Sequence, residues 1–583
     1  MTDYFEVHAR DGAARLGELR LTEPVTTPAL ADDVLRDAGS EWVEDHGVPE
    51  GDEAVLTVLP HRGFPSGAHE RVQSSFQVDS PDVSFPSAAV VTPTTAADYG
   101  ADAYVLSGAP GFVGHAEALR EAIVETRTRV PSDTALVLSG VATPANVPLL
   151  VYAGVDLVDS HRAIVKGTQG KYLTSDGERF LEDLEELPCA CPACQQPAEE
   201  FTRRGCAEHN VNALVAELAT VRERIRTGRL RDYLEGQVRF EPWLTAGLRE
   251  FDQQWGYLEA RVPVFRDSLL AATTEDALHR AEIQRFAERV TTRYQKRLDD
   301  VPLLLVPCSA TKPYSESQSH EQFQDAARYR AHLVSMTSPI GVVPQELELT
   351  YPAQHYDAAV TGHWSEDEIA FVAEVLARYL DRHDYPRVVA HVPEHGYRAV
   401  CERVEREVDV PFEYTVEDHP TTNASLSNLA AALEDERTIQ VGEKERATVR
   451  AVADYQFGDG AGDELFGGFR LQGRYPKLTA FDGDDQLAAL VPQYGLLALG
   501  LAGARRWVDS PAPIRRVEID SFVPHGNVLA PGVVDATEDI RVGDEVVVEG
   551  PRAFGVGRAE MHGAEMVASS RGVAVDVRHV EER

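Results

Sequence analysis

VPLLLVPCSATKPYSESQSH, residues 301–320, joins a run of apolar residues to a dense group of reactive side chains. The apolar half predicts a buried strand, and the polar half predicts a loop that leads into a helix over Glu321–Val334. The same order of strand and then loop returns at Arg387–Val392. Because strands that alternate with helices are typical of α/β layers, we expect residues 300–418 to form an α/β domain.

The loop after the first strand carries six candidate catalytic residues: Cys308, Lys312, Tyr314, Ser317, Ser319 and His320. An α/β domain places its ligand site where loops follow its strands. An amine beside a thiol can lower the pKa of that thiol, and a nearby imidazole can transfer a proton. We therefore interpret residues 307–320 as a catalytic loop. The alternative is a proline-bounded loop whose cysteine is simply buried.

The rest of the chain predicts four further regions, which makes the fold class multidomain α/β. Over residues 1–235 short apolar runs alternate with helical stretches, which favours an α/β layer or barrel. Residues 236–299 predict a helical connector. Residues 419–510 predict a small α+β linking domain, which begins with a polar linker at His419–Ser427. Short β-rich runs between glycines and acidic turns predict a small β-barrel over residues 511–583.

The chain is strongly acidic: 56 Lys and Arg residues stand against 95 Asp and Glu residues, a formal net charge of −39. Only six of the 56 cations are lysines. This composition is typical of a protein kept soluble in concentrated salt, where a Debye length of about 3 Å at 1 M screens self-repulsion. We interpret it as halophilic adaptation; an acidic protein from a low-salt cytosol is the alternative. An RNA-binding protein in such a cell need not be basic, because salt weakens phosphate attraction.

No stretch approaches the roughly 20 apolar residues that a membrane-spanning helix needs. The N-terminus, MTDYFEVHARDG, has neither the basic flank nor the apolar segment of a secretory signal. We therefore expect a cytoplasmic protein without a membrane partner.

Four of the six cysteines lie within eighteen residues, a clustering that favours a metal over disulfides in a cytosolic chain. Cys189, Cys191 and Cys194 are followed by His209. Three thiolates and one imidazole form a closed tetrahedral set, so we predict a structural Zn²⁺ rather than a catalytic one. Cys206 is a rival fourth ligand, and unliganded cysteines in an acidic loop are the alternative.

Two other segments contain histidines of interest. His355 and His363 are candidate substrate-binding residues, and the aromatic residues around them are expected in the core. The segment His391–His395 copies a metalloprotease metal motif, but Pro393 would break the helix that places its ligands on one face. We interpret this segment as a strand followed by a loop.

Several segments of residues 4–235 resemble tRNA-guanine transglycosylases, which are (β/α)₈ barrels. The CxCxxC spacing followed by His209-Asn210 is similar to their zinc loop, and FEVHARDGAARLGEL is similar to their opening hairpin. SGVATPANVPLLVYAGVDLVDS resembles the stretch that ends at their catalytic aspartate, which falls on Asp159. Nothing resembles the DSGGFQ segment with their second key aspartate. The resemblance implies a shortened TIM-type barrel in which Asp159 either binds a base or is structural.

The motif PCxxxKPYxxSxSH at residues 307–320 resembles the signature of archaeosine synthases. YPAQHYDAAVTGHW at 351–364, GRYPKL at 473–478 and LVPQYGLLALGLAGARRW at 490–507 are similar to later domains of that family. In the family, a separate transglycosylase places 7-cyano-7-deazaguanine (preQ0) in the tRNA D-loop. The synthase adds an amine donor such as lysine, glutamine or ammonia to the nitrile, giving archaeosine or a lysine adduct that a radical-SAM partner protein releases. The resemblance implies the same reaction here.

The residues suit this chemistry. A nitrile carbon is electrophilic, so a Cys308 thiolate can form a thioimide that an incoming amine displaces. We assign protonation of the nitrile nitrogen to His320 or Tyr314, and we assign to Lys312 the task of holding the thiolate or a carboxylate of the donor. Direct attack by the amine, with Cys308 only packing, is the alternative.

The tail from Arg515 to Arg583 is similar to a PUA domain in its order of strands and turns, which implies RNA binding by shape and backbone contacts. A β-barrel used only for dimerisation is the alternative, and a homodimer stays open. Two rival functions also stay open: a tRNA-guanine transglycosylase that inserts preQ0, and a non-catalytic tRNA-binding subunit.

Overall fold

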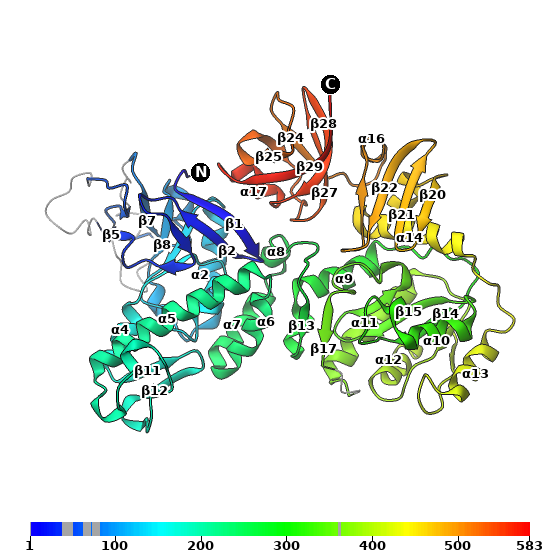
Figure 1. Ribbon diagram of the computed structural model, residues 1–583, viewed down its shortest axis with the longest axis horizontal. Coiled ribbons are helices and arrows are strands. Elements are labelled where there is room, and N and C mark those ends of the chain that lie inside the picture. Colours follow the sequence, from blue (N-terminus) through cyan, green and yellow to red (C-terminus); the bar gives the residue numbers. More distant parts are fainter. Residues whose placement is uncertain (1, 38–49, 62–70, 73–81, 360–362) are drawn as a thin grey trace. The chain divides into compact units, whose positions relative to one another are not determined.

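The computed structural model describes residues 2–37, 50–61, 71–72, 82–359 and 363–583 (Figure 1). The backbone separates into two compact units. The first contains Met1–Val262, Leu529–Val533 and Met561–Ala574; the second contains Pro263–Val528, Val534–Glu560 and Val575–Arg583. Among the described residues, no helix has the length and apolar character required to cross a membrane.

The first unit is built on seven parallel strands in the order β4-β10-β9-β8-β7-β6-β5. Their bounds are β4 (Ala29–Leu30), β5 (Leu35–Asp37), β6 (Leu56–Val58), β7 (Ser87–Val91), β8 (Ala103–Leu106), β9 (Ala135–Leu138) and β10 (Leu157–Val158). All four residues of β9 are buried and apolar, as expected for a parallel strand covered on both faces. In the described part of the chain this sheet ends at β4 and β5. The predicted shortened barrel is confirmed as a half-barrel sheet.

The opening hairpin that FEVHARDGAARLGEL implies is present, because β1 (Phe5–Asp11) pairs antiparallel with β2 (Ala14–Leu19) and Gly12 between them has a φ of 67°. The remaining strands of this unit are β3 (Val25–Thr27), β11 (Lys171–Thr174) and β12 (Gly177–Phe180). Its helices are α2 (Ala116–Arg129), α3 (Val147–Tyr152), α4 (His161–Thr168), α5 (Arg203–Arg226), α6 (Leu230–Gln237), α7 (Pro242–Asp252) and α8 (Trp255–Glu259). Helix α5 packs against both α4 and β11.

The second unit contains a five-stranded sheet in the order β16-β15-β14-β18-β19, with the predicted buried strand β14 at its centre. The strands are β14 (Leu303–Pro307), β15 (His332–Thr337), β16 (Gly341–Pro344), β18 (Val388–Ala390) and β19 (Phe412–Tyr414). All pairs are parallel except β15 with β16. Its helices are α9 (Ala281–Thr292), α10 (Gln318–Ala327), α11 (Glu366–Arg382), α12 (Gly396–Glu405) and α13 (Asn423–Ala432), of which α10, α11 and α12 surround β14 and β15 in Figure 1. A separate parallel pair joins β13 (Leu270–Ala272) to β17 (Tyr356–Ala358).

Two local predictions for this unit are wrong. The helix expected over Glu321–Val334 ends at Ala327, because Arg328 and Tyr329 take left-handed conformations with φ of 52° and 56°. The apolar residues that follow belong to β15. The polar linker expected at His419–Ser427 contains the start of α13, where Thr422 accepts a hydrogen bond from the backbone N–H of Ser425.

Beyond α13 the second unit becomes rich in antiparallel strands. It continues with α14 (Val441–Phe457), α15 (Ala461–Leu465), β20 (Arg470–Arg474), β21 (Lys477–Asp482), β22 (Asp485–Val491), β23 (Leu496–Leu499) and α16 (Leu501–Asp509). The C-terminal sheet has the order β25-β29-β28-β27-β24-β26. It is formed by β24 (Arg516–Ile519), β25 (Asn527–Leu529), β26 (Val533–Ala536), β27 (Glu545–Gly550), β28 (Ala553–Ala559) and β29 (Val573–Glu582). The helix α17 (Gly563–Ala568), before β29, belongs to the first unit. The predicted β-rich C-terminal domain is confirmed. The exact borders of the five predicted regions stay a prediction.

Candidate functional site

A group of four potential metal ligands lies where the sequence predicts it. One ligand atom from each of Cys189, Cys191, Cys194 and His209 lies within 4.8 Å of the others. The cysteines come from the loop after β12, and His209 comes from the second turn of α5. Thr202 starts α5 by accepting a hydrogen bond from a backbone N–H of the first turn.

The distances in this group suit a tetrahedral ion. The Sγ atoms of Cys191 and Cys194 are 3.6 Å apart, and Nδ1 of His209 is 3.6 and 3.4 Å from them. A tetrahedral zinc ion with Zn–S bonds of about 2.3 Å and Zn–N bonds of about 2.0–2.1 Å places two sulfurs about 3.8 Å apart and a sulfur and a nitrogen about 3.6 Å apart. The Nε2–H of His209 donates to the carbonyl of Leu173 at 2.8 Å, which leaves the lone pair of Nδ1 facing the sulfurs. The four residues therefore fit one metal ion.

Cys206, the rival ligand, lies outside this group. Its side chain is fully buried, and burial raises the pKa of its thiol to about 11. It packs with Tyr172 and Phe201, and the ring of Tyr172 stacks on His209 at 3.7 Å. Cys206 is thus part of the apolar packing that supports the ligands.

Cys308 lies at the carboxyl end of the central strand β14. Its backbone N–H donates to the carbonyl of Met336 at 3.1 Å, which extends the pairing with β15 by one residue. Its Sγ lies 3.2 Å from the hydroxyl of Tyr397, in the first turn of α12. Burial raises the pKa of Tyr397, with the Cys308 charge as a further cause, so this phenol keeps its proton at neutral pH. The half-buried thiol therefore has a protonated hydroxyl beside it.

Lys312 lies near this thiol, over an aromatic ring. Its Nζ is 4.0 Å from the centroid of Tyr356, a cation–π contact. Burial lowers the pKa of Lys312, while the Cys308 and Asp357 charges oppose that shift. In the described part of the chain no carboxylate forms an ion pair with Lys312, so its amine is available to a ligand.

The serines and the histidine of the loop form local hydrogen bonds. Ser317 caps α10, because its Oγ accepts a hydrogen bond from the backbone N–H of His320 at 3.2 Å. The Oγ of Ser319 lies 3.4 Å from the Oγ of Ser317. The Nε2–H of His320 donates to the carbonyl of Pro307 at 3.0 Å. Burial lowers the pKa of His320 to about 4, so its ring is neutral at pH 7. These contacts hold the loop around Cys308.

Tyr314 is buried behind the loop. Its hydroxyl lies 2.7 Å from that of Tyr356, which in turn lies 2.7 Å from Oγ1 of Thr337 on β15. Burial raises the pKa of both tyrosines. This chain of hydroxyls connects the loop to the sheet, and Tyr356 also supports Lys312.

Sequence reasoning missed Tyr397, which lies just after the segment set aside as a false metal motif. Trp364 packs against it, with ring centroids 4.4 Å apart. The sequence carries part of the signal: the strand at Arg387–Val392 predicts a second loop, but not which strand it neighbours. Because β18 is the parallel neighbour of β14, both loops leave the same edge of the sheet.

The strand β18 ends at Ala390, so the whole of His391–His395 is the loop that follows this strand. The ring of His391 is fully buried, with Nδ1 at 2.8 Å from Oγ1 of Thr415 and Nε2 donating to the carbonyl of Pro420 at 2.7 Å. Both ring nitrogens form hydrogen bonds within the protein, and among the described residues His391 belongs to no group of potential metal ligands.

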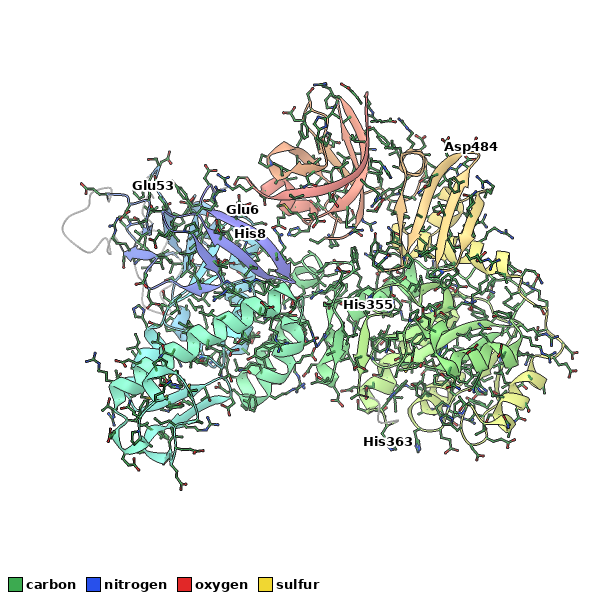
Figure 2. The ribbon with its side chains drawn as sticks, in the orientation of Figure 1. Glu6, His8, Glu53, His355, His363 and Asp484 are labelled. Carbon is green, nitrogen blue, oxygen red and sulfur yellow. The ribbon has the colours of Figure 1, made fainter. Side chains whose placement is uncertain are left out.

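His355 and His363 do not lie together. Figure 2 shows them apart in the second unit. Burial lowers the pKa of His355, whose backbone carbonyl accepts from Leu270 at 2.7 Å. His363 is exposed, and its ring lies 4.9 Å from that of His395. Their assignment to substrate binding stays a prediction.

Asp159 lines a cavity of about 600 Å³ in the first unit. Its Oδ1 accepts from the backbone N–H of Gly140 at 2.8 Å, and its Oδ2 lies 2.8 Å from Nδ1 of His161. The carboxylate follows β10, at the edge of the parallel sheet where such folds bind ligands. The volume lies within the range of about 300–1,000 Å³ that is typical of small-molecule sites.

Four family models match successive parts of the chain. They are Queuine tRNA-ribosyltransferase over residues 91–242, a domain of unknown function (DUF5591) over 283–433, the patch-forming domain C2 of tRNA-guanine transglycosylase over 447–513 and the PUA domain over 516–580. The four-ligand group falls in the first of these regions, and Cys308 falls in the second.

Individual proteins also match all or most of the chain. A protein named archaeosine synthase from Haloferax volcanii is 64% identical over 100% of both chains. An archaeosine synthase subunit alpha from Methanosarcina acetivorans is 44% identical over 100% of both chains. A tRNA-guanine(15) transglycosylase from Methanothermobacter thermautotrophicus is 29% identical over 79% of this chain and 68% of its own.

Proposed function

Because the chain belongs to the archaeosine synthase family, we propose that it adds an amine to the nitrile of preQ0 in the tRNA D-loop. It acts in archaeosine biosynthesis in tRNA, as a transferase with an RNA-binding PUA domain. One observation carries the proposal for the nitrile step. The Cys308 thiol, the Tyr397 hydroxyl at 3.2 Å and the Lys312 amine meet in the segments that follow the parallel strands β14 and β18.

The first step is addition of sulfur to the nitrile carbon. The Cys308 thiolate forms a C–S bond, one π bond of the nitrile opens, and the nitrogen takes a proton, which gives a thioimidate. Tyr397 is better placed than His320 or Tyr314 to supply this proton, because its hydroxyl lies 3.2 Å from the sulfur. The His320 N–H is bound to Pro307, and the Tyr314 hydroxyl is bound to Tyr356.

The second step is displacement by the amine donor. The amine nitrogen attacks the thioimidate carbon, returns one proton to the Tyr397 phenolate left by the first step and expels the Cys308 thiolate, which leaves an amidine. Ammonia gives archaeosine itself, and lysine gives an adduct. Glutamine supplies ammonia only after a glutaminase has hydrolysed its amide to glutamate. Lys312 binds a carboxylate of the donor, since no described carboxylate forms an ion pair with its amine, and the Asp357 charge acts on it only in opposing the effect of burial.

The four-ligand group holds a structural zinc ion. Three thiolates and one imidazole close the coordination shell, so a bound ion braces the loop after β12 and α5 and takes no part in the reaction. Cys308 and its neighbours belong to the second unit.

Several further properties follow from this proposal. The protein works in the cytoplasm, where its tRNA substrate is found, and a radical-SAM partner protein releases the product when lysine is the donor. A homodimer is compatible with this scheme. The acidic composition is halophilic, and the relative that is 64% identical is from Haloferax volcanii.

The proposal is tested by giving the protein two different substrates in molar salt. One is tRNA that already contains preQ0, with lysine, glutamine or ammonium; the other is guanine-containing tRNA with free preQ0. We expect conversion of the first substrate only, seen as a nucleoside of higher mass. Conversion of the second would identify a transglycosylase, and conversion of neither by folded, tRNA-bound protein would identify a non-catalytic subunit.

Replacing Tyr397 with Phe tests the proton donor. The substitution removes one hydroxyl and keeps the ring that packs on Trp364. We expect kcat for nitrile addition to fall by about 10²-fold, a typical contribution of a general acid, with an unchanged melting temperature. The matched control is Tyr414→Phe, which removes a hydroxyl that bonds Glu405 instead. Equal rates for Tyr397→Phe and the wild type would contradict the assignment.

A second candidate function, base exchange, is favoured by the cavity at Asp159. We propose that this cavity holds the preQ0 base when the base is not at Cys308, and does not exchange it, because the Asp159 carboxylate is already held by Gly140 and His161. Its Oδ2 can still accept from a base N–H, and a hydrogen bond to a charged group is worth about 1.5–3 kcal/mol. Asp159→Asn should therefore raise KM for preQ0-tRNA about tenfold, measured by steady-state conversion.

The control for this variant is Asp33→Asn, an exposed aspartate next to the cavity-lining Asp32 that does not itself line the cavity. An unchanged KM in Asp159→Asn would leave the aspartate with a structural role only. Incorporation of labelled preQ0 into guanine-containing tRNA by the wild type, lost in Asp159→Asn, would instead establish base exchange.

A further inference from the structure

We infer that a cavity beside the metal group binds one unstacked nucleotide of the tRNA, through the ring of Trp243 and the guanidinium of Arg162. The inference rests on the proposed function only in taking RNA as the ligand. The cavity has a volume of about 430 Å³ and lies in the first unit, between α4, the β11–β12 hairpin and the start of α7. Its size is that of a small-ligand site.

One wall of the cavity is aromatic. Trp243 is half-exposed, and its Nε1–H donates to Oε2 of Glu241 at 2.6 Å, which fixes the plane of the indole. Phe240, 58% exposed, lines the same cavity. Exposed rings held in place offer a stacking surface to any base, because every base has a π-face.

Arg162 also lines the cavity, as a cation that no carboxylate of the described residues pairs with. Among the lining carboxylates, Glu178 accepts from Lys166 at 2.7 Å and Asp176 pairs with Arg179 at 2.7 Å. Arg162 forms no ion pair with any carboxylate of the described chain, although the protein carries a net charge of −39. A guanidinium left without a carboxylate in so acidic a protein suits a phosphate, which it can bind with two parallel hydrogen bonds.

The metal motif supports the part of the lining that comes from α4 and β11. The side-chain N–H₂ of Asn210 donates to the carbonyls of Ala163 at 3.0 Å and Lys171 at 2.9 Å, and its oxygen accepts from Leu173 N–H at 2.8 Å. The adjacent ligand His209 donates to the carbonyl of Leu173. The His-Asn pair therefore ties α4, which carries Arg162, to β11, whose Leu173 lines the cavity. The metal group thus supports a binding surface.

The arrangement also suits concentrated salt. At molar ionic strength the attraction between separated charges and phosphates is largely screened. Stacking on an aromatic ring, and a guanidinium–phosphate contact at hydrogen-bond distance, lose less of their binding free energy in salt than such long-range attraction does. An acidic RNA-binding protein gains from a few such close contacts, and this cavity provides both kinds.

The test measures binding of labelled preQ0-tRNA to the full chain in molar salt by fluorescence anisotropy. We expect Trp243→Leu to raise Kd at least about fivefold and Arg162→Gln to raise it several-fold, whereas Trp243→Phe keeps a stacking ring and stays near the wild type. The controls are Trp255→Leu, which removes an exposed indole on α8, and Arg204→Gln, which removes an exposed guanidinium on α5. Neither control residue lines the cavity.

Three results would overturn the inference. The first is an unchanged Kd in Trp243→Leu and Arg162→Gln, and the second is an equal loss of tRNA affinity in the two controls. The third is quenching of Trp243 fluorescence by a free mononucleotide that binds as tightly as tRNA. The third would indicate a nucleotide site unrelated to RNA. The Phe variant, which keeps the ring, separates loss of stacking from loss of folding. Because binding is measured without turnover, a protein that binds tRNA but converts no nitrile would fail the proposed function and leave this inference standing.

Discussion

Cys308→Ala should reduce nitrile addition by about 10³-fold or more while the protein stays folded. A nucleophile that forms the covalent intermediate has no substitute in its own site, and loss of such a group is among the largest effects seen in enzymes. The side chain is half-buried and small, so its loss leaves little empty space. Single-turnover conversion of preQ0-tRNA, followed by nucleoside mass spectrometry, measures the effect.

Cys308→Ser is the companion variant, because it keeps the shape of the side chain and replaces the sulfur with a weaker nucleophile. A slow but measurable rate is expected, together with a wild-type circular dichroism spectrum and tRNA affinity. Retention of full activity in Cys308→Ala would show that the amine attacks the nitrile directly and that Cys308 only packs.

Removal of the metal should unfold one region of the first unit. His209→Ala removes the ligand that also binds the carbonyl of Leu173, so β11 loses both its metal and its hydrogen-bond anchor. Structural zinc contributes about 10–16 kcal/mol to folding in zinc-finger peptides, so the local effect should be large. We expect bound zinc to fall from one equivalent to none by elemental analysis, and backbone amides over residues 171–180 to lose hydrogen-exchange protection.

Cys206→Ala is the matched control for this experiment, because that thiol is buried beside the group but is not part of it. It should keep one equivalent of zinc and normal exchange over residues 171–180. Zinc retained in His209→Ala, or lost in Cys206→Ala, would assign the fourth ligand differently. The variants also report on the neighbouring cavity, since loss of order in β11 should weaken tRNA binding.

The parts of the fold that could be predicted are those fixed by local sequence. Strands β9 and β14 consist of short apolar runs, because a parallel strand covered on both faces has no exposed side. The metal group could be predicted because its ligands fall between residues 189 and 209, where the spacing of cysteines and histidine already limits the geometry.

Other features depend on contacts that the local sequence does not contain. The end of α10 could not be predicted because the left-handed positions at Arg328 and Tyr329 are occupied by neither glycine nor asparagine, the usual signals. Tyr397 could not be placed beside Cys308, because that contact arises only from the parallel pairing of β14 with β18. The cavity at Trp243 likewise combines elements from distant parts of the chain.

The most direct test of nitrile addition at Cys308 follows the donor nitrogen. Wild-type protein and Cys308→Ala are incubated in molar salt with preQ0-tRNA and a ¹⁵N-labelled donor, and the tRNA nucleosides are weighed. With the wild type and lysine we predict a nucleoside whose mass equals that of preQ0 nucleoside plus the labelled lysine. With ammonium, or with glutamine and a glutaminase, the mass should equal that of preQ0 nucleoside plus labelled ammonia. With Cys308→Ala we predict unchanged preQ0 nucleoside. Unlabelled, unchanged preQ0 nucleoside after incubation with folded, tRNA-bound wild type would contradict the account.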